Sequence, residues 1–274
     1  RENDAALLCL SMETIAGKMM VIRSIVGNLK LFVTDPTSNP LEWIDSPIQF
    51  SAMVPLQVEK ILGTNPLLFN QLDQLIIGGG PVSTHLIENL KNIHYTAYQT
   101  FGMTETISHV ALRKIGEITE TYYTALPSVS FEEKDQQLII HYPGVLSEAL
   151  ITNDLVELIS KKTFKWLGRT DFIINSGGVK INPEEVESKL SNVIKFPFFI
   201  AGIPDDRLGS KVILVLESLQ KTNLNKEELK QFLSPFSIPK LVFYCENFER
   251  TKSGKTNRIA TLNQLSSMDY EAIL

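Results

Sequence analysis

The chain has 274 residues, of which 43% are hydrophobic and 21% charged, and its formal net charge is -5 at pH 7. At roughly 150 residues per domain this length predicts about two globular domains. The mild negative charge argues against a nucleic-acid-binding surface, and no apolar run approaches the ~18 residues that span a bilayer. The first residues do not resemble a signal peptide, so we expect a cytoplasmic protein without membrane insertion.

Cysteine and histidine patterns exclude several classes of site. The two cysteines, Cys9 and Cys245, lie far apart without C-x-x-C spacing, and this predicts reduced structural thiols. The four histidines form no H-E-x-x-H pair, and the chain has no G-x-S-x-G sequence. Zinc hydrolase and serine hydrolase chemistry therefore have no support.

The first part of the chain alternates strands and helices, as in an α/β sheet. Residues 5–10 are almost wholly apolar, which predicts a strand buried on both faces, and a helix is expected over 14–26. The apolar stripe expected on this helix comprises Ile15, Met19, Ile22 and Val26. Further strands are expected at 29–33, 48–54 and 72–77, and further helices at 55–62 and 84–90.

A glycine-rich turn follows the strand at 72–77. It comprises Gly78, Gly79, Gly80 and Pro81. Ser83 is a favourable N-cap for the next helix, so a flat ring or an anion could contact main-chain N–H groups here. A plain tight turn is the alternative, since the sequence is not a G-x-G-x-x-G fingerprint.

Residues 98–106 join a strand expected at 93–98 to a polar turn. Phe101 could stack on a base, Thr104 could donate to a phosphate oxygen, and Glu105 could hold a Mg²⁺ ion that bridges phosphates. An ordinary strand-to-loop turn is the alternative for this stretch taken alone.

Between residues 119 and 165 the hydrophobic period changes to two, which predicts two β-hairpins. The first pairs 128–133 with 137–142, and the second pairs 155–159 with 163–167. Asp154, expected at the entrance of the second hairpin, could accept hydrogen bonds from two ribose hydroxyls. Alternatively it caps its own turn.

A domain boundary is expected at 169–171, which gives domains at 1–170 and 171–274. After it a small polar hairpin precedes a helix at 183–190, whose first-turn proline and glutamates suit a helix N-terminus. The remaining elements of this α+β unit are strands at 196–203, 211–217 and 240–244 and a helix at 226–233. A cationic loop, 250–258, ends the pattern. Its Gly-Lys-Thr sequence is not a Walker motif, because the first glycine of that motif is missing. If the loop has no catalytic role, it is a solvated basic loop.

The order of five motifs resembles the acyl-adenylate-forming superfamily of acyl- and aryl-CoA ligases, luciferases and peptide-synthetase adenylation domains. These motifs lie at 78–81, 101–105, 152–154, 168–171 and 253–255, so the resemblance covers nearly the whole chain. Within the superfamily the chain is most similar to the o-succinylbenzoate-CoA ligases of menaquinone biosynthesis.

The resemblance implies an α/β fold. We expect the C-terminal part of a large adenylate-forming domain, with mixed sheets, helices and a small β-barrel-like section, followed by a small α+β lid domain. It also implies a ligase that uses ATP, Mg²⁺ and coenzyme A and acts on small molecules, with o-succinylbenzoate as the expected acid. The alternatives are another aryl- or acyl-CoA ligase, a carrier-protein adenylation enzyme, and a nucleotide-binding module without catalysis.

The resemblance assigns a role to each matching residue. The expected ATP/AMP-binding residues are Gly78, Gly79, Gly80, Pro81, Phe101, Gly102, Asp154 and Arg169. Asp154 and Arg169 would contact the ribose, Thr104 the phosphates and Glu105 the metal ion. Lys255 would be the catalytic lysine, because a cation placed between the substrate carboxylate and the α-phosphate stabilises the charge that accumulates there.

Further roles concern the lid and the acid. Asp171 would be the hinge, and the loop brought toward the site for CoA comprises Ser176, Gly177 and Gly178. Thr14 and Arg23 would belong to the acyl pocket. Arg23 lies six residues beyond Gly17 and could meet a second substrate carboxylate with two parallel hydrogen bonds. The alternative places Arg23 on the solvent side of its helix.

Four departures from the family pattern stand out. Phe101 replaces a tyrosine, Asn153 replaces a glycine, and Thr14 stands where relatives often have an aromatic residue or a histidine. The fourth is that the Ser/Thr/Gly-rich phosphate loop would lie upstream of Arg1. We therefore expect a fragment that is inactive or weakly active alone.

Overall fold

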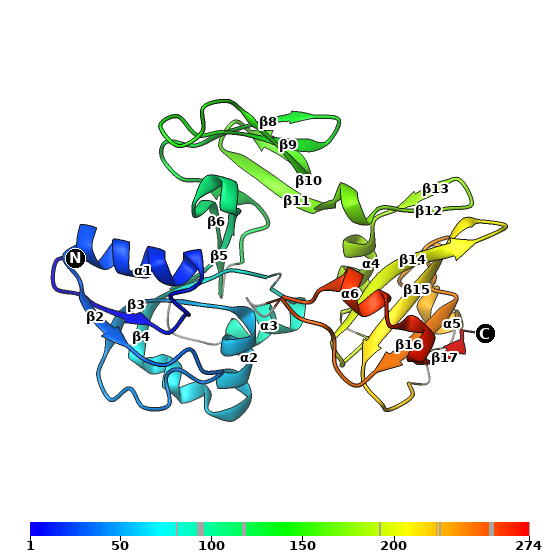
Figure 1. Ribbon diagram of the computed structural model, residues 1–274, viewed down its shortest axis with the longest axis horizontal. Coiled ribbons are helices and arrows are strands. Elements are labelled where there is room, and N and C mark those ends of the chain that lie inside the picture. The colour runs from blue at the N-terminus through cyan, green and yellow to red at the C-terminus, as the bar shows by residue number, and fades with distance from the viewer. Residues whose placement is uncertain are drawn as a thin grey trace. The chain divides into compact units, whose positions relative to one another are not determined.

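The computed structural model describes residues 1–80, 82–91, 96–116, 119–191, 193–222, 224, 226–251 and 255–273 (Figure 1). The chain forms two compact units. The first comprises 1–134, 139–151 and 158–165, and the second comprises 135–138, 152–157 and 166–274. The predicted boundary between residues 170 and 171 stays a prediction.

The larger sheet has eleven strands. They are β1 (Ala5–Leu8), β2 (Lys30–Val33), β3 (Ile48–Met53), β4 (Leu72–Ile77), β5 (Thr96–Gly102), β6 (His109–Ile115), β7 (Tyr123–Ala125), β8 (Ser130–Lys134), β9 (Gln137–His141), β10 (Leu150–Ser160) and β11 (Thr163–Arg169). Their order is β2-β1-β3-β4-β5-β6-β7-β11-β10-β9-β8. Strands β1 to β5 are parallel neighbours, whereas β6 and β7 continue the sheet in antiparallel fashion.

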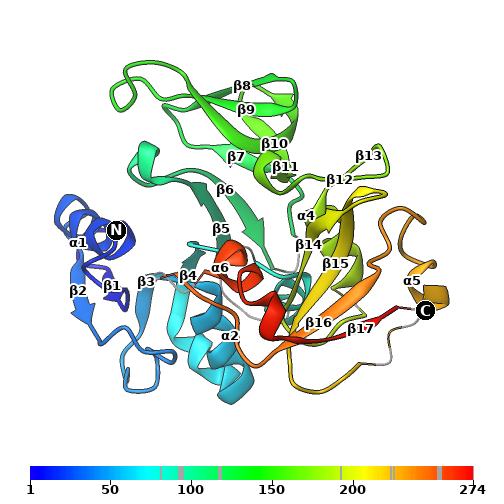
Figure 2. The same cartoon turned by 45° about the vertical axis from the view of Figure 1, so that its right-hand side comes forward.

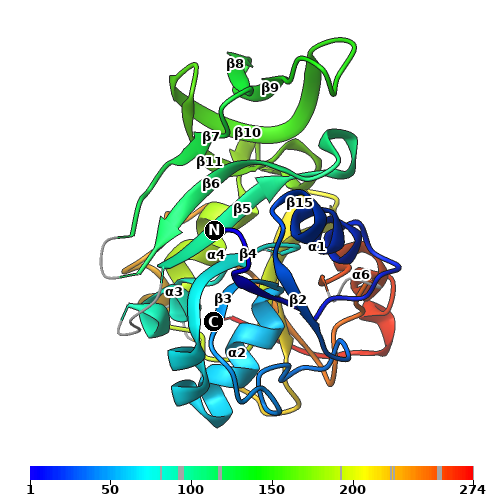
Figure 3. The same ribbon diagram turned by 90° about the vertical axis from the view of Figure 1, so that its left-hand side faces the viewer.

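Helices cover both faces of the parallel strands of the first unit (Figures 1 and 3). The helices are α1 (Ile15–Val26), α2 (Pro55–Thr64) and α3 (Thr84–Leu90), with 3-10 turns at Pro66–Gln71 and Thr104–Thr106. Leu7 packs in the cluster that contains residues of α2 and α3, whereas Leu8 packs with Met20 of α1. Because successive strand residues face opposite sides, the apolar run of β1 is buried on both faces, as predicted.

The second unit contains a six-stranded sheet (Figure 2). Its elements are β12 (Ile174–Ser176), β13 (Val179–Ile181), α4 (Pro183–Leu190), β14 (Phe198–Asp205), β15 (Gly209–Glu217), α5 (Lys226–Leu229), β16 (Leu241–Cys245), α6 (Arg258–Leu262) and β17 (Asp269–Ala272), with 3-10 turns at Thr170–Phe172 and Leu265–Ser267. One apolar cluster joins the sheet to α4 and α5, and a second joins its other face to Leu262 of α6. Strands and helices are mixed here as the sequence predicts for an α+β unit, although the helix predicted at 226–233 ends at Leu229.

Local sequence explains the start of α4. Asn182 caps the helix by accepting hydrogen bonds from the backbone nitrogens of Glu184 and Glu185, at 3.0 and 3.4 Å. Pro183 occupies the first helical position, where its missing N–H is not needed. In the preceding hairpin, Gly177 and Gly178 have φ values of 59° and 80°, which a tight turn between β12 and β13 requires.

The predicted apolar stripe of α1 is wrong, although the helix itself is present. Ile15, Ile22 and Val26 are 45%, 47% and 82% exposed. The residues that α1 buries are Gly17, Met20 and Ser24. Met20 packs with Leu8 of β1, and a Cβ at Gly17 would lie 2.3 Å from the carbonyl oxygen of Ser11, so tertiary packing rather than hydrophobic periodicity selects the buried face.

The strand predicted at 93–98 continues further than expected. The observed strand, β5, runs from Thr96 and ends at Gly102, and residues 92–95 lie outside the described residues. Pairing with β6 sustains the strand, since Phe101 lies opposite Ala111 and the register shifts between Phe101 and Gly102. The sequence patterns did not identify β6, β7, α6 or β17.

The two cysteines are reduced and buried, as predicted. Cys9 and Cys245 are free and buried, and burial raises the pKa of both thiols to about 11. No helix in the described part of the chain is long and apolar enough to cross a membrane.

Candidate functional site

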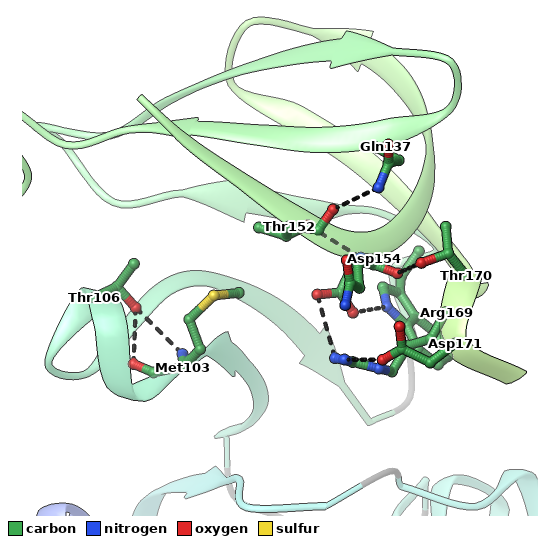
Figure 4. Close-up of polar contacts among 10 residues, drawn as sticks. Met103, Thr106, Gln137, Thr152, Asp154, Arg169, Thr170 and Asp171 are labelled. Atoms are coloured by element: carbon green, nitrogen blue, oxygen red, sulfur yellow. Dashed lines mark hydrogen bonds and ion pairs between the residues drawn. The ribbon is translucent and has the colours of Figure 1, made fainter. Parts of the chain in front are cut away.

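Asp154 is a buried carboxylate with an ordered environment (Figure 4). It lies inside β10 rather than at the strand entrance predicted, so the turn-capping alternative is wrong. Its Oδ1 accepts a 2.8 Å hydrogen bond from Nε1 of Trp166, and its backbone nitrogen donates to Oγ1 of Thr152 at 3.1 Å. Burial raises the pKa of Asp154, while the bond from Trp166 and the charge of Arg169 oppose that rise.

Arg169 stands between two carboxylates. Its Nη2 donates to Oδ2 of Asp171 at 2.7 Å, and its Nη1 lies 3.8 Å from Oδ2 of Asp154. Thr170, which lies between Arg169 and Asp171 in the sequence, donates from Oγ1 to the carbonyl of Asn153 at 3.3 Å. The structure therefore brings together three predicted residues, Asp154, Arg169 and Asp171, within the second unit.

The turn after β5 is fixed by a side chain that the sequence analysis missed. Thr106 is 1% exposed, and its Oγ1 accepts from the backbone nitrogen of Met103 at 3.2 Å (Figure 4). The same hydroxyl lies 2.8 Å from the carbonyl oxygen of Ser108. Ile107, which directly follows Thr106, has a φ of 65°, an uncommon backbone conformation for a β-branched residue. This rigid turn leaves Thr104 and Glu105 exposed.

The other residues predicted to bind ATP or AMP lie in different surroundings. The half-buried ring of Phe101 packs edge-on against Phe164, with ring centroids 5.1 Å apart. Gly78 donates its backbone N–H to the carbonyl of Met53 at 3.1 Å, and Gly79 and Gly80 follow it directly after β4. Pro81, the fourth predicted residue of this turn, lies outside the described residues.

Arg23 is half-buried and is not on the solvent side of α1. Its Nη2 lies 3.1 Å from Oγ of Ser108 and 3.2 Å from Nδ1 of His109. Burial lowers the pKa of His109 to about 4, and the charge of Arg23 acts in the same direction, so the imidazole is neutral at pH 7. The other residue of the predicted acyl pocket, Thr14, is the N-cap of α1 and accepts from the backbone nitrogen of Gly17 at 3.3 Å.

Lys255 is exposed in a loop that its own backbone closes. Its nitrogen donates to Oγ1 of Thr251 at 3.1 Å, and its carbonyl accepts from the nitrogen of Thr251 at 2.8 Å. Residues 252–254 lie outside the described residues. Ser176 is buried at the end of β12, and the exposed pair Gly177 and Gly178 forms the turn after it.

The described residues contain no group of three or more histidine, cysteine, aspartate and glutamate side chains that could hold a metal ion together. A Mg²⁺ ion needs fewer protein ligands, because it is commonly bound through one or two carboxylates plus substrate phosphates. The exposed carboxylate of Glu105, beside the hydroxyl of Thr104, fits that kind of site.

Comparisons with known proteins support the resemblance to acyl-CoA ligases. No known family profile matches the chain. A curated 2-succinylbenzoate–CoA ligase from Geobacillus sp. (strain WCH70) is 25% identical to this chain. The alignment is 301 residues long and covers 94% of this chain and 60% of that protein. The chain thus spans about three fifths of the length of the curated relatives it matches.

Solved structures share the fold. An O-succinylbenzoate coenzyme A synthetase from Bacillus subtilis, in complex with ATP and magnesium ion, has a TM-score of 0.73 and 20% identity over 97% of this chain and 62% of its own. An AMP-forming acyl-CoA synthetase/AMP-acid ligase II-like protein from Dyadobacter fermentans is 33% identical, with a TM-score of 0.60, over 96% of this chain and 79% of its own. The chain therefore belongs to the family of AMP-forming acyl-CoA synthetases.

Proposed function

We propose that this chain carries the nucleotide, acyl and lysine sites of an ATP-dependent acid–CoA ligase. In the first step an oxygen of the substrate carboxylate attacks the α-phosphorus of ATP, and pyrophosphate leaves. In the second step the thiol sulfur of CoA attacks the acyl carbon of the acyl-adenylate, and AMP leaves. The observation that carries the proposal is the buried, oriented carboxylate of Asp154 beside Arg169, in a chain of this family.

Asp154 and Arg169 would bind the ribose. Trp166 occupies Oδ1 of Asp154, whereas Oδ2 lies 3.8 Å from Arg169, which is longer than a hydrogen bond. Oδ2 therefore keeps capacity to accept a ribose hydroxyl, and the Arg169 guanidinium keeps N–H groups for the nucleotide. The remaining residues proposed to bind ATP or AMP are Gly78, Gly79, Gly80, Pro81, Phe101 and Gly102.

Thr104 and Glu105 would meet the triphosphate. The rigid turn held by Thr106 fixes their backbone and leaves both side chains accessible. Glu105 would hold Mg²⁺ with one carboxylate, and Thr104 would donate to a phosphate oxygen. When bound there, Mg²⁺ would neutralise part of the phosphate charge.

Lys255 would act only in the first step. Its ammonium would lie between the substrate carboxylate and the α-phosphate, where two anions converge. After adenylation the small domain would turn at Asp171, withdraw Lys255 and bring Ser176, Gly177 and Gly178 to the site for attack by CoA. Small-molecule partners and a cytoplasmic location stay predictions.

We further propose that the acid carries a second carboxylate, as o-succinylbenzoate does. Arg23 is half-buried, burial lowers its pKa, and no ion pair joins it to a carboxylate among the described residues. A half-buried cation that faces the neutral groups of Ser108 and His109 is suited to an anionic ligand, because an unpaired buried carboxylate would be costly. The curated relatives named 2-succinylbenzoate–CoA ligases support this choice.

Mass spectrometry of the products would test the proposed reaction. The full-length protein is incubated with ATP, Mg²⁺, CoA and o-succinylbenzoate. We expect o-succinylbenzoyl-CoA and AMP. An acyl-adenylate that CoA does not consume would indicate a carrier-protein adenylation enzyme, and no product from any acid would indicate a nucleotide-binding module.

The choice of acid is tested by Arg23→Ala, with Lys18→Ala on the exposed side of α1 as the control. The variant loses one partner of a buried charge pair. The fall in its kcat/KM for o-succinylbenzoate should therefore correspond to a loss of roughly 2–4 kcal/mol in transition-state stabilisation. A monocarboxylate that lacks the ring carboxyl should be affected much less. Equal losses for both acids would remove Arg23 from the recognition of the second carboxylate.

A further inference from the structure

Two arginine–glutamate ion pairs flank Lys255 in the second unit. Arg250 lies five residues before the lysine, and Arg258 lies three residues after it. We call the pairs Arg250–Glu217 and Arg258–Glu187 the flanking ion pairs. Each one joins a residue of the predicted cationic segment, 250–258, to a helix or strand of the second unit.

The first flanking pair fastens the loop to β15. Nη2 of Arg250 lies 2.9 Å from Oε1 and 2.7 Å from Oε2 of Glu217, the last residue of that strand. Oε1 of Glu217 also accepts from the backbone nitrogen of Phe248 at 2.7 Å. The Glu217 side chain is only 12% exposed, so both of its oxygens are committed to the segment that leads into the loop.

The second flanking pair fastens the loop to α4. Nη2 of Arg258 lies 2.8 Å from Oε2 of Glu187, and the two side chains are 17% and 18% exposed. Oε1 of Glu187 accepts from the backbone nitrogen of Ile200 in β14 at 2.8 Å. The guanidinium carbon of Arg258 lies 5.0 Å from the ring centroid of Phe172 and 5.6 Å from that of Phe199.

These contacts restrict the loop on both sides. A guanidinium that is stacked on two rings and bonded to a carboxylate has little freedom to rotate. Two backbone contacts also hold the residues on either side of Lys255 together: Arg250 and Thr256 form a β-bridge, and the nitrogen of Asn257 donates to the carbonyl of Glu249 at 2.7 Å. Lys255 therefore lies between two residues, Arg250 and Arg258, that are anchored to different elements of one unit.

An ion pair on the same helix provides the contrast. Lys189 and Glu185 of α4 are 2.6 Å apart, but their side chains are 48% and 62% exposed. An exposed pair of this kind contributes little to structure, because water and salt screen it. Glu187 and Glu217 differ from Glu185 in two ways. Their side chains are largely buried, and each also accepts a hydrogen bond from a backbone nitrogen.

We propose that Glu187 and Glu217 are positioning residues for Lys255, acting through Arg258 and Arg250. The inference rests on the proposed function, in which Lys255 serves adenylation and not thioester formation. Displacement of a reacting group by about 1 Å can cost on the order of 100-fold in rate. Loss of a flanking pair should therefore impair the first step and spare the second.

The test uses the full-length protein and the variants Glu187→Gln and Arg250→Gln, with Glu185→Gln as the control. Adenylation is measured by ATP–pyrophosphate exchange, and thioester formation is measured from supplied acyl-adenylate and CoA. We expect Glu187→Gln and Arg250→Gln to lower exchange by about 10- to 100-fold and to change thioester formation by less than about twofold. The control should match the wild type in both assays.

A double-variant comparison identifies the route of action. In a Lys255→Ala background, Glu187→Gln should cause no further loss of exchange, because the group that it positions is gone. A further loss, equal losses in both assays, or no loss in either assay would overturn the proposal. If Glu187→Gln does not fold, Arg250→Gln decides, since its side chain is 32% exposed.

The outcome is distinguishable from a failure of the proposed function. If the wild type forms no acyl-adenylate, the proposed function itself fails. If Lys255→Ala abolishes exchange while both flanking variants retain it, the function stands and only the positioning role is refuted.

Discussion

The indole nitrogen of Trp166 lies 2.8 Å from Oδ1 of Asp154, and this hydrogen bond joins β11 to β10 inside the second unit. The bond orients the buried carboxylate, so that its second oxygen, Oδ2, lies on the side of Arg169. The proposed ribose contact depends on that orientation, so the donor on Trp166 is as much a part of the site as the acceptor on Asp154.

Removal of this donor should destabilise the unit. Trp166→Phe keeps an aromatic ring but leaves the buried carboxylate without its partner, so the unfolding free energy should fall by roughly 1–3 kcal/mol. Urea unfolding followed by circular dichroism measures the change. The other tryptophan, Trp43, is 82% exposed, and Trp43→Phe is the matched control. Equal unfolding free energies for Trp166→Phe and the wild type would contradict the assigned role of the bond.

Gly102 should tolerate no side chain. A Cβ at this position would lie 2.4 Å from Cα of His109 and 2.6 Å from the carbonyl oxygen of Ser108, and these backbone atoms cannot rotate away. Gly102→Ala should therefore lower the unfolding free energy by about 1–3 kcal/mol. At Gly63 in α2, an added Cβ would have no atom within 4 Å, so Gly63→Ala should be neutral or stabilising by up to about 1 kcal/mol. Thermal unfolding of both variants would refute the packing argument if Gly102→Ala melted at the wild-type temperature.

His109 should remain neutral well below pH 6.5. Burial, and then the charge of Arg23, hold the pKa of its imidazole at about 4 in the folded protein. Because the unfolded chain binds the proton more readily, this histidine contributes stability that is complete above pH 6.5 and is lost as the pH falls toward 4. NMR titration of the His109 ring should give the low pKa, and Arg23→Gln should raise it while burial keeps it below 6.5. A wild-type pKa near 6.5 would contradict the buried contact with Arg23.

Glu187 should give the opposite dependence on pH. Burial raises its pKa from 4.5 to about 7, against the opposing effects of Arg258 and the N–H of Ile200. Between pH 4.5 and 7 the folded state binds more protons than the unfolded state, so its contribution to stability falls as the pH rises through this window. Chemical unfolding at several pH values should show that Glu187→Gln removes this slope; an unchanged slope would assign the pKa shift elsewhere.

Local sequence signals predicted part of this structure well. The bounds predicted for β4, α3 and α4 agree with those observed, because a glycine turn, the Ser83 cap and the Asn182–Pro183 start act within a few residues. Motif order likewise singled out Asp154, Arg169 and Asp171 as candidate site residues, and the structure brings these three side chains together.

Long-range packing decided what the sequence patterns could not predict. Periodicity favoured Ile15 and Ile22 as the buried face of α1, but tertiary packing buries Gly17, Met20 and Ser24 instead. Asp154 was expected at a strand entrance, yet pairing extends β10 on both sides of it. The bonds from Trp166 to Asp154 and from Arg258 to Glu187 join residues 12 and 71 positions apart, and no local pattern specifies them.

The most direct test of the proposed chemistry is acid-dependent ATP–pyrophosphate exchange in the absence of CoA, measured for the full-length protein and for Lys255→Ala. An adenylating ligase that uses this lysine should exchange only when the acid is present, and the variant should lose on the order of 100- to 1,000-fold in rate. It should still convert supplied acyl-adenylate and CoA to the thioester. Exchange that does not require the acid, or a Lys255→Ala variant that exchanges at the wild-type rate, would contradict the proposed chemistry.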